Sequence, residues 1–110
     1  MRPRYKHLIA SVLIALAALA VTSAADGEVP TAADFAACND EAPAAAQAGA
    51  VLPTSSDRAR AGRARAGAMT TGVGNVIESA DPQIHGMEAE GAKNATYQAG
   101  YRTCMRRKGF

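Results

Sequence analysis

The sequence predicts a mainly α-helical protein: a secretory signal helix, then a small disulfide-linked helical pair with a flexible, low-complexity middle. Three observations predict this: an apolar run near the N-terminus, two widely separated cysteines on apolar helix faces, and an Arg/Gly/Ala repeat between those cysteines. With 110 residues, 12 Lys/Arg, 10 Asp/Glu and no Trp, the chain suits one small domain without a large aromatic core.

Residues 1–25 have the three-part pattern of a cleaved secretory signal. Three basic residues and no acid precede an apolar run over 8–21, and small residues lead to Ala24 and Ala25, the two expected cleavage points. A 14-residue helix spans about 21 Å, less than the roughly 30 Å of a bilayer core, which argues against a membrane anchor. We therefore expect a periplasmic or secreted protein without a membrane span after cleavage. A lipid-modified Cys38 is disfavoured, because acidic residues separate it from the apolar run.

Charge is unevenly distributed in the remaining chain. From residue 26 through Asp57 there are six acidic residues and no basic one, whereas from Arg58 onward there are nine basic and four acidic residues. The two parts therefore have complementary charge, although an exposed ion pair contributes little to stability. The near-neutral total argues against a specific nucleic-acid partner.

Residues 26–49 predict an acidic helical segment. Thr31 is a plausible N-cap, and Asp34 stands where a carboxylate can complete a capping box. We expect Pro43 to end or kink this helix, or to begin a second short helix that stops at Gly49. The spacing i, i+3, i+7 places three residues on one apolar face: Phe35, Cys38 and Ala42.

Residues 50–80 are interpreted as a flexible linker with at most a transient helix after Ser55 or Ser56. A five-residue unit, Arg-Ala-Arg-Ala-Gly, occurs twice over residues 58–67. Its period does not match a helix or a strand, so its arginines form no single basic face. Two interpretations stand: a solvated spacer, or a site that binds lipopolysaccharide, lipid head groups or nucleic acid, with no aromatic residue available for base stacking. The candidate anion-binding residues are Arg58, Arg60, Arg63 and Arg65.

Residues 81–110 predict a turn followed by a basic amphipathic helix. Asn94 can cap this helix, and Gly109 is a natural left-handed residue after its end, which lets Phe110 fold back. Tyr97, Tyr101, Cys104 and Met105 recur as an apolar stripe. The candidate face for a protein partner is formed by Tyr97, Tyr101, Met105 and Phe110.

The two cysteines predict an intramolecular disulfide between Cys38 and Cys104. Both lie on apolar helical faces of a chain expected to be exported, and their number is even. Free thiols, intermolecular pairing and metal binding are the alternatives. Only His85 adds a further soft ligand, which is too few for a zinc site.

No catalytic motif is present at a recognisable spacing, so we expect no enzyme activity and no cofactor. His85 and Met87 are weak candidates for a periplasmic copper site, because an imidazole and a thioether stand two residues apart. The alternative is that Met87 packs in the core and His85 lies in a surface loop.

The C-terminal pattern Tyr97-x3-Tyr101-Arg102-x-Cys104-Met105-Arg106-Arg107-x-Gly109-Phe110 resembles the ending of small exported bacterial proteins with an earlier cysteine segment. The run from Asp81 to Met87, with Gly91, is also similar to such chains. The resemblance covers about residues 31–42 and 79–110. It implies export and a paired-cysteine scaffold, with no known activity. The expected function is that of a non-enzymatic cell-envelope protein that contacts an unknown protein partner.

Overall fold

The computed structural model describes residues 29–110, so the signal prediction for residues 1–25 lies outside the described residues. Four helices follow in order: α2 (Ala32–Gln47), α3 (Ser55–Arg65), α4 (Ala89–Ala92) and α5 (Ala95–Arg107). Between residues 29 and 110 the only β pairing is a pair of isolated antiparallel bridges, Thr71 to Ile77 and Val76 to Glu88. The mainly α-helical class is confirmed.

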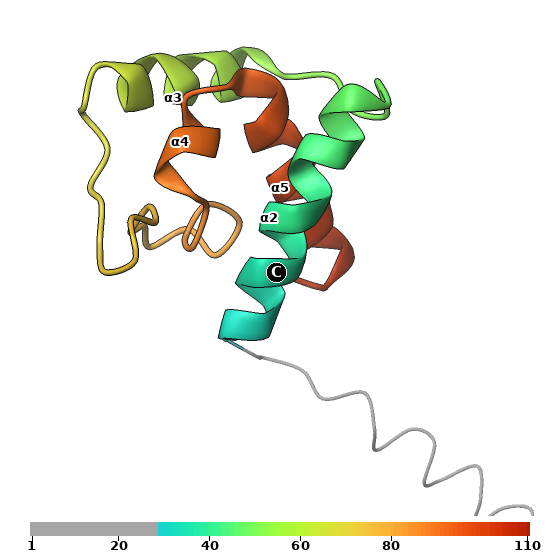
Figure 1. The fold of residues 1–110 in the computed structure, drawn as a ribbon, viewed down its shortest axis with the longest axis horizontal. Helices are drawn as coiled ribbons and strands as arrows, with labels where there is room; N and C mark the ends of the chain where they lie inside the picture. The colour runs from blue at the N-terminus through green and yellow to red at the C-terminus, as the bar shows by residue number, and fades with distance from the viewer. Residues whose placement is uncertain (1–28) are drawn as a thin grey trace, which may run out of the picture.

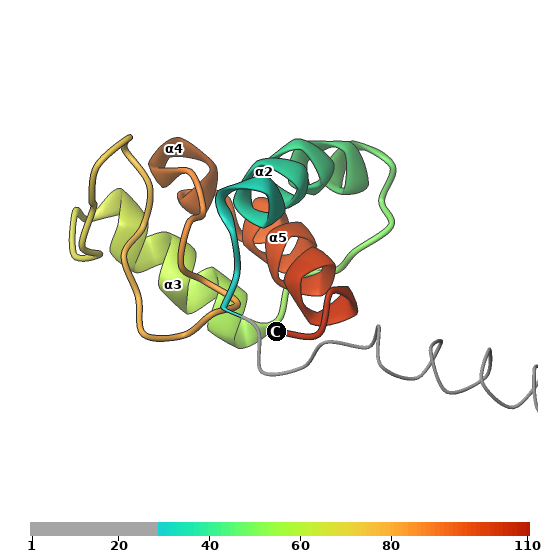
Figure 2. The same ribbon diagram turned by 90° about the horizontal axis from the view of Figure 1, so that it is seen from below.

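Helices α2 and α5 lie side by side and form the main contact of the fold (Figures 1 and 2). Gly100 of α5 allows their close approach: a Cβ there would lie 3.0 Å from the carbonyl oxygen of Ala42. Helix α3 packs against α5 and α4, while residues 66–88 form a long connection beside them. The two ends of the described chain, residues 29–110, therefore pack together, with α3 on the other side of α5.

Helix α2 begins as predicted, with a capping box between Thr31 and Asp34. It then continues as one helix through Pro43 to Gln47, so two of the alternatives for Pro43, an end near Ala42 and the start of a second helix, are wrong. A proline in a helix lacks the N–H that would donate to the carbonyl four residues earlier, here that of Asn39. The hydroxyl of Tyr97 donates to this carbonyl oxygen at 3.2 Å. Its single proton is shared with Asn39 Oδ1, which lies 2.7 Å away, so a group from α5 replaces the missing hydrogen bond in part.

The middle segment, interpreted as a flexible linker with at most a transient helix after Ser55 or Ser56, contains an 11-residue helix, α3, which begins at Ser55. Thr54 and Asp57 form a second capping box, which starts the helix. Asp57, Ala61 and Ala64 are buried along its inner side, so the two repeat units supply small residues that let the helix approach α5. This buried row was not predicted from the sequence, because the five-residue period of the repeat does not match the 3.6-residue period of a helix.

Helix α5 matches its prediction at both ends. The Asn94 side chain accepts from the backbone N–H groups of Thr96 and Tyr97. At the C-terminus the N–H of Phe110 donates to Met105 O at 3.1 Å and that of Gly109 donates to Arg106 O at 3.0 Å, the pair of bonds that defines a Schellman ending.

The core lies between these helices and residues 77–87. Its buried members are mostly small or medium-sized, which fits the alanine-rich composition. Polar Asp57 and Gln98 are buried with them. Within residues 29–110 no helix combines the length and the apolar character needed to cross a membrane. The buried cluster comprises Cys38, Ala42, Ala64, Ile77, Ile84, Met87, Ala92, Tyr97, Tyr101, Cys104 and Met105.

Candidate functional site

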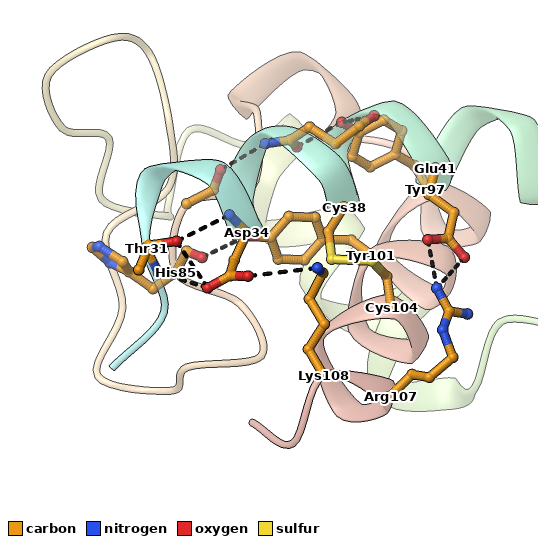
Figure 3. The surroundings of a disulfide bond; sticks show 12 residues. Thr31, Asp34, Cys38, Glu41, His85, Tyr97, Tyr101, Cys104, Arg107 and Lys108 are labelled. Carbon is orange, nitrogen blue, oxygen red and sulfur yellow. Dashed lines mark hydrogen bonds and ion pairs between the residues drawn. A yellow bond between two sulfur atoms is a disulfide. The ribbon is translucent and has the colours of Figure 1, made fainter. Parts of the chain in front are cut away.

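The Cys38–Cys104 disulfide joins α2 to α5 (Figure 3). The two Cα atoms are 5.5 Å apart, and neither cysteine is exposed to solvent. The predicted pairing is therefore confirmed. Because the bond spans a sequence separation of 66 residues, it links the two ends of the described fold.

Ion pairs flank the disulfide and join the acidic part of the chain to the basic part (Figure 3). Arg107 of α5 pairs with Glu41 of α2, and Lys108 lies 3.5 Å from Asp34. A backbone hydrogen bond from Thr31, with a smaller contribution from Lys108, lowers the pKa of Asp34. Acidic residues of α2 thus pair with basic residues at the end of α5. These pairs are solvent-accessible and contribute little to stability.

Asn39 connects α2 to two other parts of the fold. Its Nδ2 donates to the carbonyl oxygen of Gly86 at 2.9 Å, while its Oδ1 accepts from the N–H of Glu88 at 2.9 Å. The same Oδ1 accepts from the hydroxyl of Tyr97 at 2.7 Å. One amide therefore holds the connection at residues 86–88 against α2 and α5.

The predicted interaction face on α5 is wrong, because its aromatic stripe forms the core. Tyr101 and Met105 are fully buried and Tyr97 is 9% exposed, while Phe110 is partly buried against the same cluster. The hydroxyl of Tyr101 donates to His85 O at 2.6 Å. Burial is the main cause that raises the pKa of both tyrosines. Their side chains hold the fold together and are not available as a contact surface.

Asp57 is a buried carboxylate that receives several hydrogen bonds. Its Oδ1 pairs with Arg60 and with Arg102, and its Oδ2 accepts from the backbone N–H of Thr54. Burial alone would raise the pKa of Asp57, but the Thr54 and Arg102 hydrogen bonds outweigh it and lower the pKa. The charged form is therefore the one that the fold stabilises.

The structure separates the four repeat arginines by role. Arg60 donates from Nε to Gln98 Oε1 at 3.0 Å and also pairs with Asp57, while Arg65 donates to the carbonyl oxygen of Lys93 at 2.8 Å. Arg58 and Arg63 are exposed and form no ion pair with a carboxylate of residues 29–110. Arg60 is thus used within the fold, whereas Arg58 and Arg63 are fully available to a ligand and Arg65 keeps donors beyond its one hydrogen bond.

His85 and Met87 are not arranged as a metal site. Met87 is fully buried in the core, so the interpretation of Met87 as a copper ligand is wrong. His85 accepts the N–H of Ser79 at Nδ1, 3.2 Å away, and its ring lies edge-on to that of Phe35 with centroids 5.4 Å apart. The described part of the chain contains no group of three or more His, Cys, Asp or Glu side chains that could hold a metal ion.

Sequence reasoning did not identify Asn39, Asp57 or Gln98 as key polar residues. The Thr54-x-x-Asp57 spacing is a capping-box signal that could have located the start of α3. No local signal identifies Asn39 or Gln98, because their partners lie on other elements. No family model, curated protein or solved structure matches the chain. The described residues form a fold held by one disulfide and by partly buried hydrogen bonds between elements.

Proposed function

We propose that this chain is a small, non-enzymatic, exported protein of the bacterial cell envelope that acts through contacts with another protein. The observation that supports the exported location is the fully buried disulfide between α2 and α5. Such bonds form and persist in oxidising compartments outside the cytoplasm and are rare within it. The signal-like pattern of residues 1–25 supports the same location.

The use of the polar side chains supports a role without catalysis. Tyr101 donates its hydroxyl to a backbone carbonyl, and the His85 Nδ1 accepts a backbone N–H. The Asp57 carboxylate is paired with two arginines. These groups hold elements in place, and none of the three offers a free nucleophile or base beside a partner arranged for proton transfer.

Export is tested by expressing the full chain and a chain lacking residues 2–25 in the same bacterium. Thiols are alkylated before lysis, and the intact mass is measured in periplasmic and cytoplasmic fractions. We expect the full chain in the periplasm, shortened by its leader and with neither cysteine alkylated. The leaderless chain is the control and should stay in the cytoplasm with two alkylated cysteines. Two alkylated cysteines in the full-chain product would contradict the proposal.

The protein contact is tested by crosslinking the tagged chain in its own envelope. We expect one specific crosslinked protein, which is retained when Arg58 and Arg63 are both replaced by Gln. Loss of crosslinking in this variant, or loss of retention at high salt, would support a charged ligand instead.

Anion binding through α3 is a second candidate, favoured by the exposure of Arg58 and Arg63 without a carboxylate partner in residues 29–110. Its test is sedimentation with vesicles that contain phosphatidylglycerol or only neutral lipid. Selective binding to the anionic vesicles should weaken in Arg58→Gln/Arg63→Gln. Arg106→Gln is the control, because it removes an exposed arginine from another helix. Equal binding to both vesicle types would reject this candidate.

A further inference from the structure

Three methionines lie among residues 29–110, and they differ in exposure. Met87 and Met105 are fully buried in the core. Met69 is only partly buried: it packs against the core and also lines a pocket of about 260 Å³ between the end of α3, the connection after it and α4. Figure 1 shows these three segments on the side of the molecule away from α2. A small solute that enters the pocket can therefore reach Met69 but neither of the other two methionines, which have no exposed surface.

The other sulfur atoms of the described residues are protected from solvent. Cys38 and Cys104 are bonded to each other, and neither is exposed. Oxidants that deliver an oxygen atom react with sulfur according to its exposure, and they convert a methionine thioether into a sulfoxide. Within residues 29–110, Met69 is therefore the residue whose sulfur is open to such an oxidant.

The polar lining of the pocket suits the product of this oxidation. A sulfoxide is polar, so it disrupts a protein core when the methionine is fully enclosed. Beside Met69, however, the pocket is lined by side chains that can donate hydrogen bonds, namely Arg65, Thr71, Asn75 and Lys93. Arg65 uses one donor on the carbonyl oxygen of Lys93 and keeps others. An oxygen added to Met69 therefore has donors and solvent in the same pocket, and the fold does not have to bury it unpaired.

We propose that Met69 is an oxidation site for small hydroperoxides, such as hydrogen peroxide, and that the fold is kept when its sulfoxide forms. The sulfur lone pair attacks one oxygen of the peroxide and the O–O bond breaks. The proton of the transferred hydroxyl goes to the departing hydroxide, which leaves as water, so the sulfur is oxidised and the peroxide is reduced. This inference goes beyond the proposed function and does not depend on it, because neither export nor a protein partner enters the argument.

The test treats the full chain, isolated with its disulfide intact, with hydrogen peroxide and follows oxygen uptake by mass spectrometry. Met69 and Met87 lie in one tryptic peptide, residues 66–93, so fragment ions compare the two in the same sample. In the folded protein Met69 should gain oxygen at least about tenfold faster than Met87 or Met105, because an enclosed side chain reacts only when the fold opens. In concentrated urea all three should react at similar rates, which shows that the fold causes the difference.

Met69→Leu is the matched variant, because leucine has no sulfur and keeps an apolar side chain of similar volume against the core. It should lose the fast oxidation, while Met87 and Met105 keep their slow rates. Amide NMR spectra of the protein with one oxygen on Met69 should change only around residues 64–77 and 89–93. The proposal is overturned if Met87 or Met105 of the folded protein reacts as fast as Met69, or if oxidation of Met69 alone collapses the dispersion of the amide spectrum.

Discussion

Asp57 of α3 and Arg102 of α5 form an ion pair across 45 residues of sequence, with Arg102 Nη1 2.7 Å from Asp57 Oδ1. Arg60, one turn further along α3, pairs with the same oxygen. The carboxylate is 1% exposed, so both guanidinium groups depend on it for neutralisation in a largely buried position. This arrangement fixes α3 against α5 in a part of the chain with few large apolar side chains.

Replacement of Asp57 by Asn should therefore cause a large loss of stability. Two partly buried arginines would keep their charge without a partner, and breaking a buried pair from one side typically costs about 3–5 kcal/mol. Urea unfolding of the variant measures the loss. Asp40→Asn, at an exposed position on α2, is the control and should change the free energy of unfolding by no more than about 0.5 kcal/mol. Equal losses in the two variants would contradict the role given to Asp57.

The same carboxylate should make the fold acid-sensitive. Its pKa is lower in the folded protein than the value of about 3.9 for a free Asp, so its contribution is complete well above pH 4. That contribution is lost as the pH falls through the folded pKa, because the unfolded chain then binds the proton more readily. Free energies of unfolding between pH 7 and pH 2.5 should fall less steeply in Asp57→Asn. Asp34 also has a lowered pKa but is present in both proteins, so the difference reports Asp57.

The parts of the fold that the sequence predicts are those encoded by local signals. Helix α5 carries its own cap at Asn94, its own apolar stripe and its own Gly109 ending, and all three are found in the structure. The disulfide was predictable because each cysteine lies on the apolar face of a recognisable helix. The signals of α5 lie within a few positions of one another, and the pairing of Cys38 with Cys104 follows because the chain has only two cysteines.

The parts that the sequence does not predict depend on distant partners. The five-residue repeat in α3 lacks a helical period, and it is held by Arg102, 45 residues beyond Asp57. The tyrosine stripe was correctly identified as apolar, but its pattern does not distinguish a core from a contact surface. The structure shows that the stripe is buried against α2. The spacing of apolar residues within α5 cannot predict which other helix packs against it.

Gly86→Ala should destabilise the protein more than Gly49→Ala. Both glycines have positive φ, +87° and +64°, so alanine is strained at either position. A Cβ at Gly86 would also fall onto the Phe35 ring that packs against His85, whereas a Cβ at Gly49 would meet nothing within 4 Å. Backbone strain should cost about 1 kcal/mol at each site, and displacement of Phe35 should add about 1–3 kcal/mol at Gly86. Thermal unfolding of the two variants measures the difference, and equal melting temperatures would contradict the contact.

Loss of the disulfide should lower stability by about 4 kcal/mol. This value follows from the chain-entropy model for a closed loop with a sequence separation of 66 residues. Cys38→Ala/Cys104→Ala tests it by urea unfolding, with the oxidised protein as the reference. The dithiothreitol-reduced protein provides a second measurement without a change of sequence. An unchanged unfolding midpoint in both samples would contradict the expected loss of stability.

The Tyr97 hydroxyl should be energetically coupled to Pro43. Proline at this position leaves the Asn39 carbonyl without its helical donor, and the hydroxyl donates to that oxygen at 3.2 Å. Tyr97→Phe should therefore cost about 1–3 kcal/mol in the natural sequence, because it also removes the bond to Asn39 Oδ1. In a Pro43→Ala background the restored N–H can donate to the carbonyl, so Tyr97→Phe should cost less.

A double-mutant cycle measured by urea unfolding isolates this coupling, and the expected interaction energy is about 0.5–1.5 kcal/mol. Ala44→Gly, next to Pro43 on the exposed side of α2, is the control background, because it weakens the helix without supplying a donor to Asn39. Tyr97→Phe should cost the same in that background as in the natural sequence. If its cost is equal in the Pro43→Ala and Ala44→Gly backgrounds, the hydroxyl does not substitute for the missing helical bond, and the continuation of α2 past Pro43 must depend on packing against α5 alone.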